Sequence, residues 1–149
     1  MVKLWLCAFV QLAVGISLLA QTAVKITIFN EGNDEGSSRT EQDVRAELGT
    51  LLDGRYDVTI ESLYLDQLAN FEQTLAQVEA SATDLIIAVG FEACNRFAAR
   101  ETYIKPTILA FLLDNELQGV PPPQEGSSGV TNLTYVQSPF DIGRDFEML

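Results

Sequence analysis

Residues 85–89 read Leu-Ile-Ile-Ala-Val, and this short apolar run decides the fold. Asp84 precedes the run and Gly90 ends it. Apolar residues without polar alternation fit a strand that is covered on both faces, as in a parallel sheet between helices. Residues 107–112, Thr-Ile-Leu-Ala-Phe-Leu, have the same character. We therefore expect both segments to be central strands of a mainly parallel sheet.

Strand-like and helix-like segments alternate on either side of these two runs. Further strands are expected over residues 24–29, 56–63 and 129–134, and helices from Ser38, over about 66–81 and over 91–101. Such alternation predicts a single doubly wound α/β sheet, flavodoxin-like, with strand order 2-1-3-4-5. Ligands of these sheets bind outside the carboxyl ends of the strands, at the switch point between the first and third. The loops expected there span residues 30–38, 90–93 and 113–115.

The first helix is expected to begin at Ser38, because Ser38 and Glu41 have the spacing of a capping box. Its apolar stripe would bury Val44, Leu48, Leu51 and Leu52.

The first 23 residues have the pattern of a secretory signal. Lys3 precedes an apolar run over residues 4–20, and the candidate cleavage sites are Ala20 at the end of the run and Ala23 shortly after it. We expect an exported, periplasmic protein without stable membrane insertion after cleavage, and an uncleaved anchor remains the alternative.

Composition excludes several classes of function. The formal net charge of −12 disfavours nucleic acid as a partner, because such a surface repels phosphate backbones. Histidine is absent, which removes the commonest general base and the favourite zinc ligand. Of the two cysteines, Cys7 lies in the predicted signal, so Cys94 is expected to be an unpaired, buried thiol.

The loop after the first expected strand reads NEGNDEGS and contains no G-x-G-x-x-G turn or P-loop. Its carboxylates would repel a phosphate, and its spacing does not match an EF-hand calcium loop, so a solvated acidic loop is favoured. We expect no cofactor, no metal and no enzymatic activity.

From Asp84 onward the chain carries an ordered series of short motifs. An aspartate, an apolar strand, a glycine and a small-residue helix start are followed by Lys-Pro, a second apolar strand ending near an aspartate, and a Gly-Val-Thr strand. These elements are Asp84, residues 85–89, Gly90, Ala93, Lys105-Pro106, residues 107–112, Asp114 and Gly129-Val130-Thr131. The stretch from Asp84 to Leu149 thereby resembles periplasmic substrate-binding proteins of the uncharacterised ABC-transporter type, which have the type I periplasmic-binding fold and relatives that bind tryptophan and tyrosine.

The resemblance implies that residues 24–137 form an N-terminal lobe, and that residues 138–149 begin a truncated second lobe or a terminal helix. It also implies a small-molecule ligand and an ABC permease as partner. The family usually has Thr or Ser directly after the glycine, whereas this chain has Phe91 and Glu92. An aromatic ring beside a carboxylate favours a ligand with an amine or an aromatic face over an acid.

The expected ligand-binding residues are Asn30, Glu31, Gly90, Phe91, Glu92 and Asp114. The alternative function is a periplasmic sensor or adaptor lobe that acts through contact with another protein.

Overall fold

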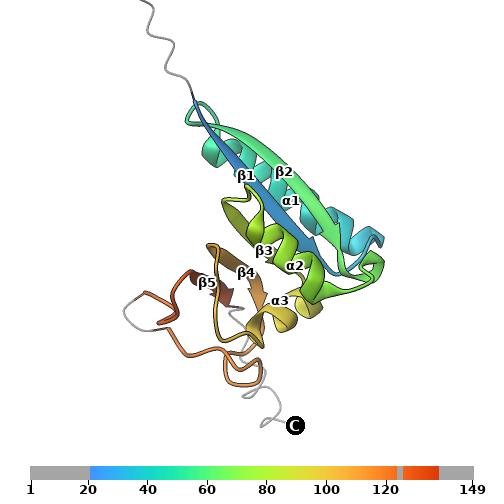
Figure 1. The fold of residues 1–149 in the computed structure, drawn as a ribbon, viewed down its shortest axis with the longest axis vertical. Helices are drawn as coiled ribbons and strands as arrows, with labels where there is room; N and C mark the ends of the chain where they lie inside the picture. Colours follow the sequence, from blue (N-terminus) through green and yellow to red (C-terminus); the bar gives the residue numbers. More distant parts are fainter. Residues whose placement is uncertain (1–20, 124–125, 138–149) are drawn as a thin grey trace, which may run out of the picture.

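The apolar run at residues 85–89 forms strand β3, which lies at the centre of a five-stranded sheet (Figure 1). The computed structural model describes residues 21–123 and 126–137. Its strands are β1 (Thr22–Asn30), β2 (Tyr56–Tyr64), β3 (Leu85–Val89), β4 (Thr107–Leu112) and β5 (Leu133–Gln137). Their order is β2-β1-β3-β4-β5 and every neighbouring pair is parallel. The predicted α/β fold class and strand order are therefore confirmed.

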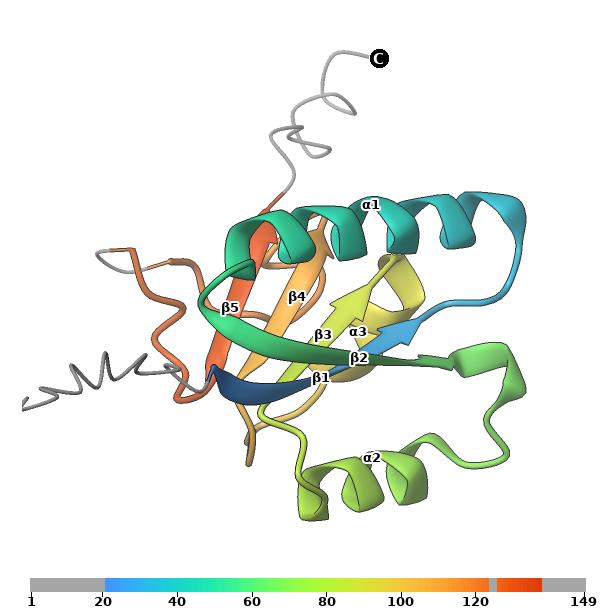
Figure 2. The same ribbon diagram turned by 90° about the horizontal axis from the view of Figure 1, so that it is seen from above.

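Helices cover both faces of the sheet, and Figure 2 shows α1 and α2 on opposite sides of it. The helices are α1 (Glu35–Leu52), the short 3-10 helix η1 (Leu65–Gln67), α2 (Phe71–Ala80) and α3 (Phe91–Ala98). The apolar stripe Val44, Leu48 and Leu52 of α1 packs against the face that contains Ile26, Ile28, Ile87 and Val89. Helices α2 and α3 pack against the other face of the sheet.

Three phenylalanines form the centre of the layer under α2 and α3. Phe29, Phe71 and Phe97 come from β1, α2 and α3, and their ring centroids lie 5.2–5.8 Å apart in edge-to-face pairs. Such pairs add to the stabilisation that comes from burying the rings. This cluster packs the first turn of α2 and the last turn of α3 against β1.

The predicted start of the first helix is wrong. α1 begins at Glu35, because the Asp34 side chain accepts the backbone N–H groups of Gly36 and Ser37 and so caps the helix one turn before Ser38. Leu51 is also not in the buried stripe and is 66% exposed.

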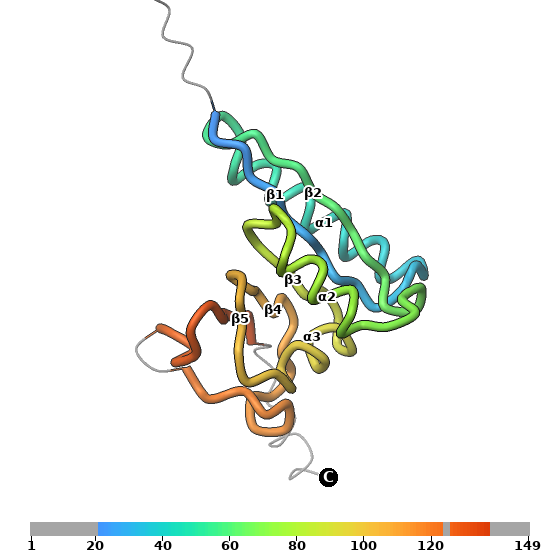
Figure 3. Tube along the Cα trace, viewed as in Figure 1, coloured from blue at the N-terminus to red at the C-terminus, as the bar shows by residue number. Residues whose placement is uncertain are grey.

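The predicted strand over residues 129–134 is also wrong in position, since β5 begins at Leu133. A turn replaces the expected strand, because Asn132 has a φ of 62° and the backbone N–H of Leu133 donates to the carbonyl oxygen of Val130 at 3.2 Å. The Nδ2 of Asn132 also donates a hydrogen bond to the carbonyl oxygen of Tyr103 at 2.9 Å. The described part of the connection from β4 to β5 contains no helix, and Figure 3 shows it as a long irregular path.

Two predicted segments lie wholly or mostly outside the described residues. These are the signal, apart from its last three positions, and residues 138–149. Thr22 and Ala23 of the predicted signal belong to β1 and pair with Tyr56 and Asp57. Within the described ranges, none of the helices has both the length and the apolar character needed to cross a membrane.

Candidate functional site

The carboxyl ends of β1, β3 and β4 border a cavity of about 410 Å³. It is lined by Glu31, Thr40, Val44, Val89, Gly90, Phe91, Ala110 and Phe111. The connection after β1 leads to α1 on one face, whereas that after β3 leads to α3 on the other. The cavity therefore lies at the switch point where doubly wound sheets bind ligands, and its volume suits a small molecule.

Glu31 and Gly90 meet at this point because of the strand register. Asn30 is paired with Val89, so the next residue of each strand leaves the sheet at the same level. The Glu31 carboxylate turns to the first turn of α3, where Oε1 accepts the backbone N–H of Glu92 at 2.5 Å. A Cβ atom on residue 90 would lie 2.6 Å from Cγ of Glu31, and Gly90 has a φ of 94°. Only glycine allows this close approach without strain.

Phe91 and Phe111 provide the aromatic part of the cavity wall, and each is 43% exposed. Phe111 was not predicted as a site residue. Simple alternation would place its side chain on the same face as Leu109, but the register of β4 against β5 shifts between Leu109 and Leu112. The irregularity leaves Phe111 exposed at the cavity, and an all-apolar strand gives no sequence signal for it.

Asn30 was predicted to bind ligand, but it is only 1% exposed, and its side chain forms hydrogen bonds within the protein. Its Nδ2 donates to the Ser37 carbonyl oxygen at 3.1 Å and lies 3.4 Å from Oε2 of Glu41, and its Oδ1 accepts the N–H of Glu31 at 2.9 Å. Asn30 thus fixes the loop that carries Glu31 and does not line the cavity.

Glu92 and Asp114 do not line the cavity either. The Glu92 carboxylate pairs with Arg96 one turn along α3, with 3.0 Å between Oε1 and Nε. The Asp114 carboxylate accepts the N–H of Leu117 at 2.9 Å, which closes a turn after β4. Of the predicted residues, the structure brings Glu31, Gly90 and Phe91 together at the cavity.

A second feature that the sequence did not predict is the buried carboxylate of Glu41, which is 6% exposed. It accepts hydrogen bonds from Arg45 at 2.7 Å, from Tyr64 at 2.9 Å and from Ser62. Burial alone would raise the pKa of Glu41, but these hydrogen bonds, with that of Asn30, outweigh it and lower the pKa below 4.5. Glu41 therefore joins α1 to β2 and is not the capping partner of Ser38.

Cys94 is fully buried and unpaired, as predicted. Burial raises the pKa of its thiol to about 11, so the reactive thiolate is scarce at neutral pH.

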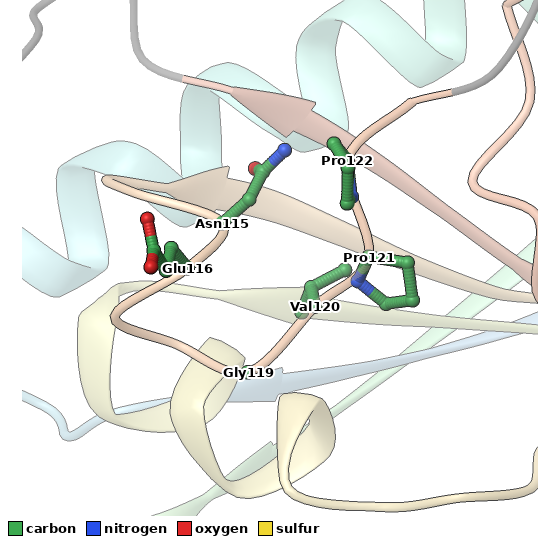
Figure 4. A pocket seen from close by; sticks show the side chains of 6 residues that line it. All are labelled: Asn115, Glu116, Gly119, Val120, Pro121 and Pro122. Atoms are coloured by element: carbon green, nitrogen blue, oxygen red, sulfur yellow. The ribbon is translucent and has the colours of Figure 1, made fainter.

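Another cavity, of about 470 Å³, lies within the connection that follows β4 (Figure 4). It is lined by Asn115, Glu116, Gly119, Val120, Pro121 and Pro122, all from one loop. Because no strand end contributes to its wall, the cavity is less rigidly built than the one at the switch point. We regard the switch-point cavity as the better candidate site.

In the described part of the chain, no three His, Cys, Asp or Glu side chains are placed to hold a metal ion. No family model, curated protein or solved structure matches the chain.

Proposed function

We propose that this chain is the N-terminal lobe of an exported solute-binding protein, which holds a small molecule without chemical conversion and presents it to an ABC permease. The observation that carries the proposal is the cavity of about 410 Å³ at the switch point of the sheet. Its wall combines one carboxylate with two half-exposed phenylalanines, and small-molecule sites commonly pair a few polar groups with apolar walls.

The composition of the cavity favours binding over catalysis. The chain has no histidine, and its one described cysteine is buried with a raised pKa. Among the residues that line the cavity, only Glu31 carries an ionisable side chain. General acid–base or nucleophilic catalysis needs at least a nucleophile and a base within hydrogen-bonding distance, and this wall offers no such pair.

An NMR titration of the full chain tests the proposal. Amines, aromatic amino acids and small organic acids are added to the ¹⁵N-labelled protein. We expect shift changes at residues 31, 90, 91, 110 and 111, with dissociation constants of about 0.1–1 mM, because one lobe covers only one side of a ligand. Shift changes confined to other residues would show that the cavity is not the site.

Matched variants assign the binding to the cavity. Phe111→Ala removes an exposed ring at the carboxyl edge of the sheet, and we expect it to weaken binding about tenfold. Ile104→Ala is the control, because Ile104 is 67% exposed but precedes β4 and so lies at the opposite edge. It should change the dissociation constant less than twofold.

An adaptor function is the second candidate, and the exposed apolar residues Phe91, Phe111, Leu117 and Val136 favour it. All four lie at or after the carboxyl ends of their strands, which would suit a protein contact at this edge. A stable complex with another exported protein, formed without ligand and lost in Phe111→Ala, would support the adaptor function over solute binding.

A further inference from the structure

Glu31 occupies a position that a ligand carboxylate could otherwise take. The first backbone N–H groups of a helix carry partial positive charge and bind anions. In α3 the Glu92 N–H already donates to the Glu31 carboxylate, and the Glu31 side chain lies against Gly90. An incoming acid group would have to displace this carboxylate and would be repelled by it.

The Glu31 charge is also not balanced by a side chain in the described part of the chain. The ion pairs there involve Glu41, Glu61, Glu72, Glu79 and Glu92, and none involves Glu31. One face of the Glu31 carboxylate is held by α3, and the residue also lines the cavity beside Phe91 and Phe111.

We propose that Glu31 selects the ligand's charge, so that the cavity takes an organic amine whose ammonium group lies against Glu31. This inference rests on the proposed small-molecule site. The rings of Phe91 and Phe111 would receive the apolar or aromatic body of the ligand and would attract the cation through their faces. Val44 and Ala110 complete an apolar wall.

Three ligands of similar shape and different charge test the inference at pH 7, namely 2-phenylethylamine, 2-phenylethanol and phenylacetate. Dissociation constants are measured by NMR titration of the full chain. We expect the amine to bind about tenfold more tightly than phenylacetate, with the alcohol between them. In Glu31→Gln the amide oxygen can still accept the Glu92 N–H, so the fold is kept while the charge is lost. This variant should bring the amine-to-acid ratio to about one or reverse it.

Two further variants separate local charge from other effects. Glu47→Gln changes the net charge by the same amount at an exposed position of α1 and should leave the ratio unchanged. Glu92→Gln tests the neighbouring carboxylate that pairs with Arg96. An effect of Glu92→Gln equal to that of Glu31→Gln would refute the assignment to Glu31, as would a wild-type preference for phenylacetate. Far-UV circular dichroism and thermal unfolding verify that each variant is folded.

The outcomes also distinguish this inference from the proposed function. If all three ligands shift residues 90, 91 and 111 but the order of affinity is the same in wild type and Glu31→Gln, the site stands and the role of Glu31 is refuted. If none of them shifts the cavity residues in either protein, both the site and the role of Glu31 are refuted.

Discussion

Replacing Glu41 by glutamine should lower the free energy of unfolding at pH 7 by about 2 kcal/mol. The carboxylate accepts hydrogen bonds from Arg45, Ser62 and Tyr64, and glutamine has only one oxygen to offer them. A hydrogen bond to a charged group contributes about 1.5–3 kcal/mol. The loss should lie in the lower half of that range, because the Arg45 side chain is 34% exposed and can recover some hydration.

The effect of Glu41→Gln should depend on pH with a definite sign. Hydrogen bonding lowers the folded-state pKa of Glu41 below the ordinary value of 4.5. A carboxylate with a lowered folded pKa contributes stability above its unfolded pKa, and this contribution is lost as the pH falls through the folded pKa. Below that point the wild-type side chain is protonated and resembles glutamine. The difference in stability should therefore shrink as the pH falls below 4.5.

Urea unfolding monitored by far-UV circular dichroism measures this difference between about pH 7 and pH 3. Glu47→Gln is the control, because it removes a carboxylate from an exposed position of the same helix and should change stability by less than about 0.5 kcal/mol. A Glu41→Gln difference that stays constant with pH, or that does not exceed the control, would refute the argument that the buried charge joins α1 to β2.

Three further predictions concern the thiol, the β3–α3 turn and the N-terminus. In a Cys7→Ser background, Cys94 should react with a maleimide only slowly in the native protein and rapidly in guanidinium chloride, because burial raises its pKa to about 11. Gly90→Ala should lower the free energy of unfolding by about 1–3 kcal/mol through backbone strain and the clash with Glu31. Gly54→Ala, with a φ of 71° and open space around it, should cost less in the same urea titration. Mass spectrometry of the exported protein should show cleavage after residue 20, because cleavage after residue 23 would remove the first two residues of β1.

The strand predictions were most accurate for the central strands, which are covered on both faces and therefore need apolar residues at nearly every position. The runs at 85–89 and 107–112 are apolar apart from Thr107, and both strand boundaries match the structure. The error at β5 has a non-local cause, since Asn132, with its left-handed backbone, is held by a hydrogen bond to the carbonyl oxygen of Tyr103 in a distant segment. A contact of that kind leaves no pattern in the residues around Asn132.

The location of the candidate site could be predicted from the sequence, because it depends only on the order of the strands in the sheet. Strand order places the residues after β1 and β3 at one switch point, and Glu31, Gly90 and Phe91 line the cavity there. Asn30 was predicted on the same ground, but its side chain turns inward and is buried. The position of a residue after a strand predicts the edge of the sheet at which it lies. It does not predict whether the side chain points into the cavity or into the core. Phe111 depends on a shift of strand register, which is likewise a property of the assembled sheet.

The acidic residues around the first loop share a charge but not a function. Asp34 caps α1 through the N–H groups of Gly36 and Ser37, and Glu41 is buried against β2. Glu31 is the acidic residue of this group that lines the cavity. The charge of the cavity should therefore depend on one side chain and not on the loop as a whole. Neutralising Asp34 or Glu41 should first reduce the stability of α1, whereas neutralising Glu31 should first change which ligands bind. Equal effects of all three substitutions on ligand preference would instead assign selectivity to the summed negative field of the loop.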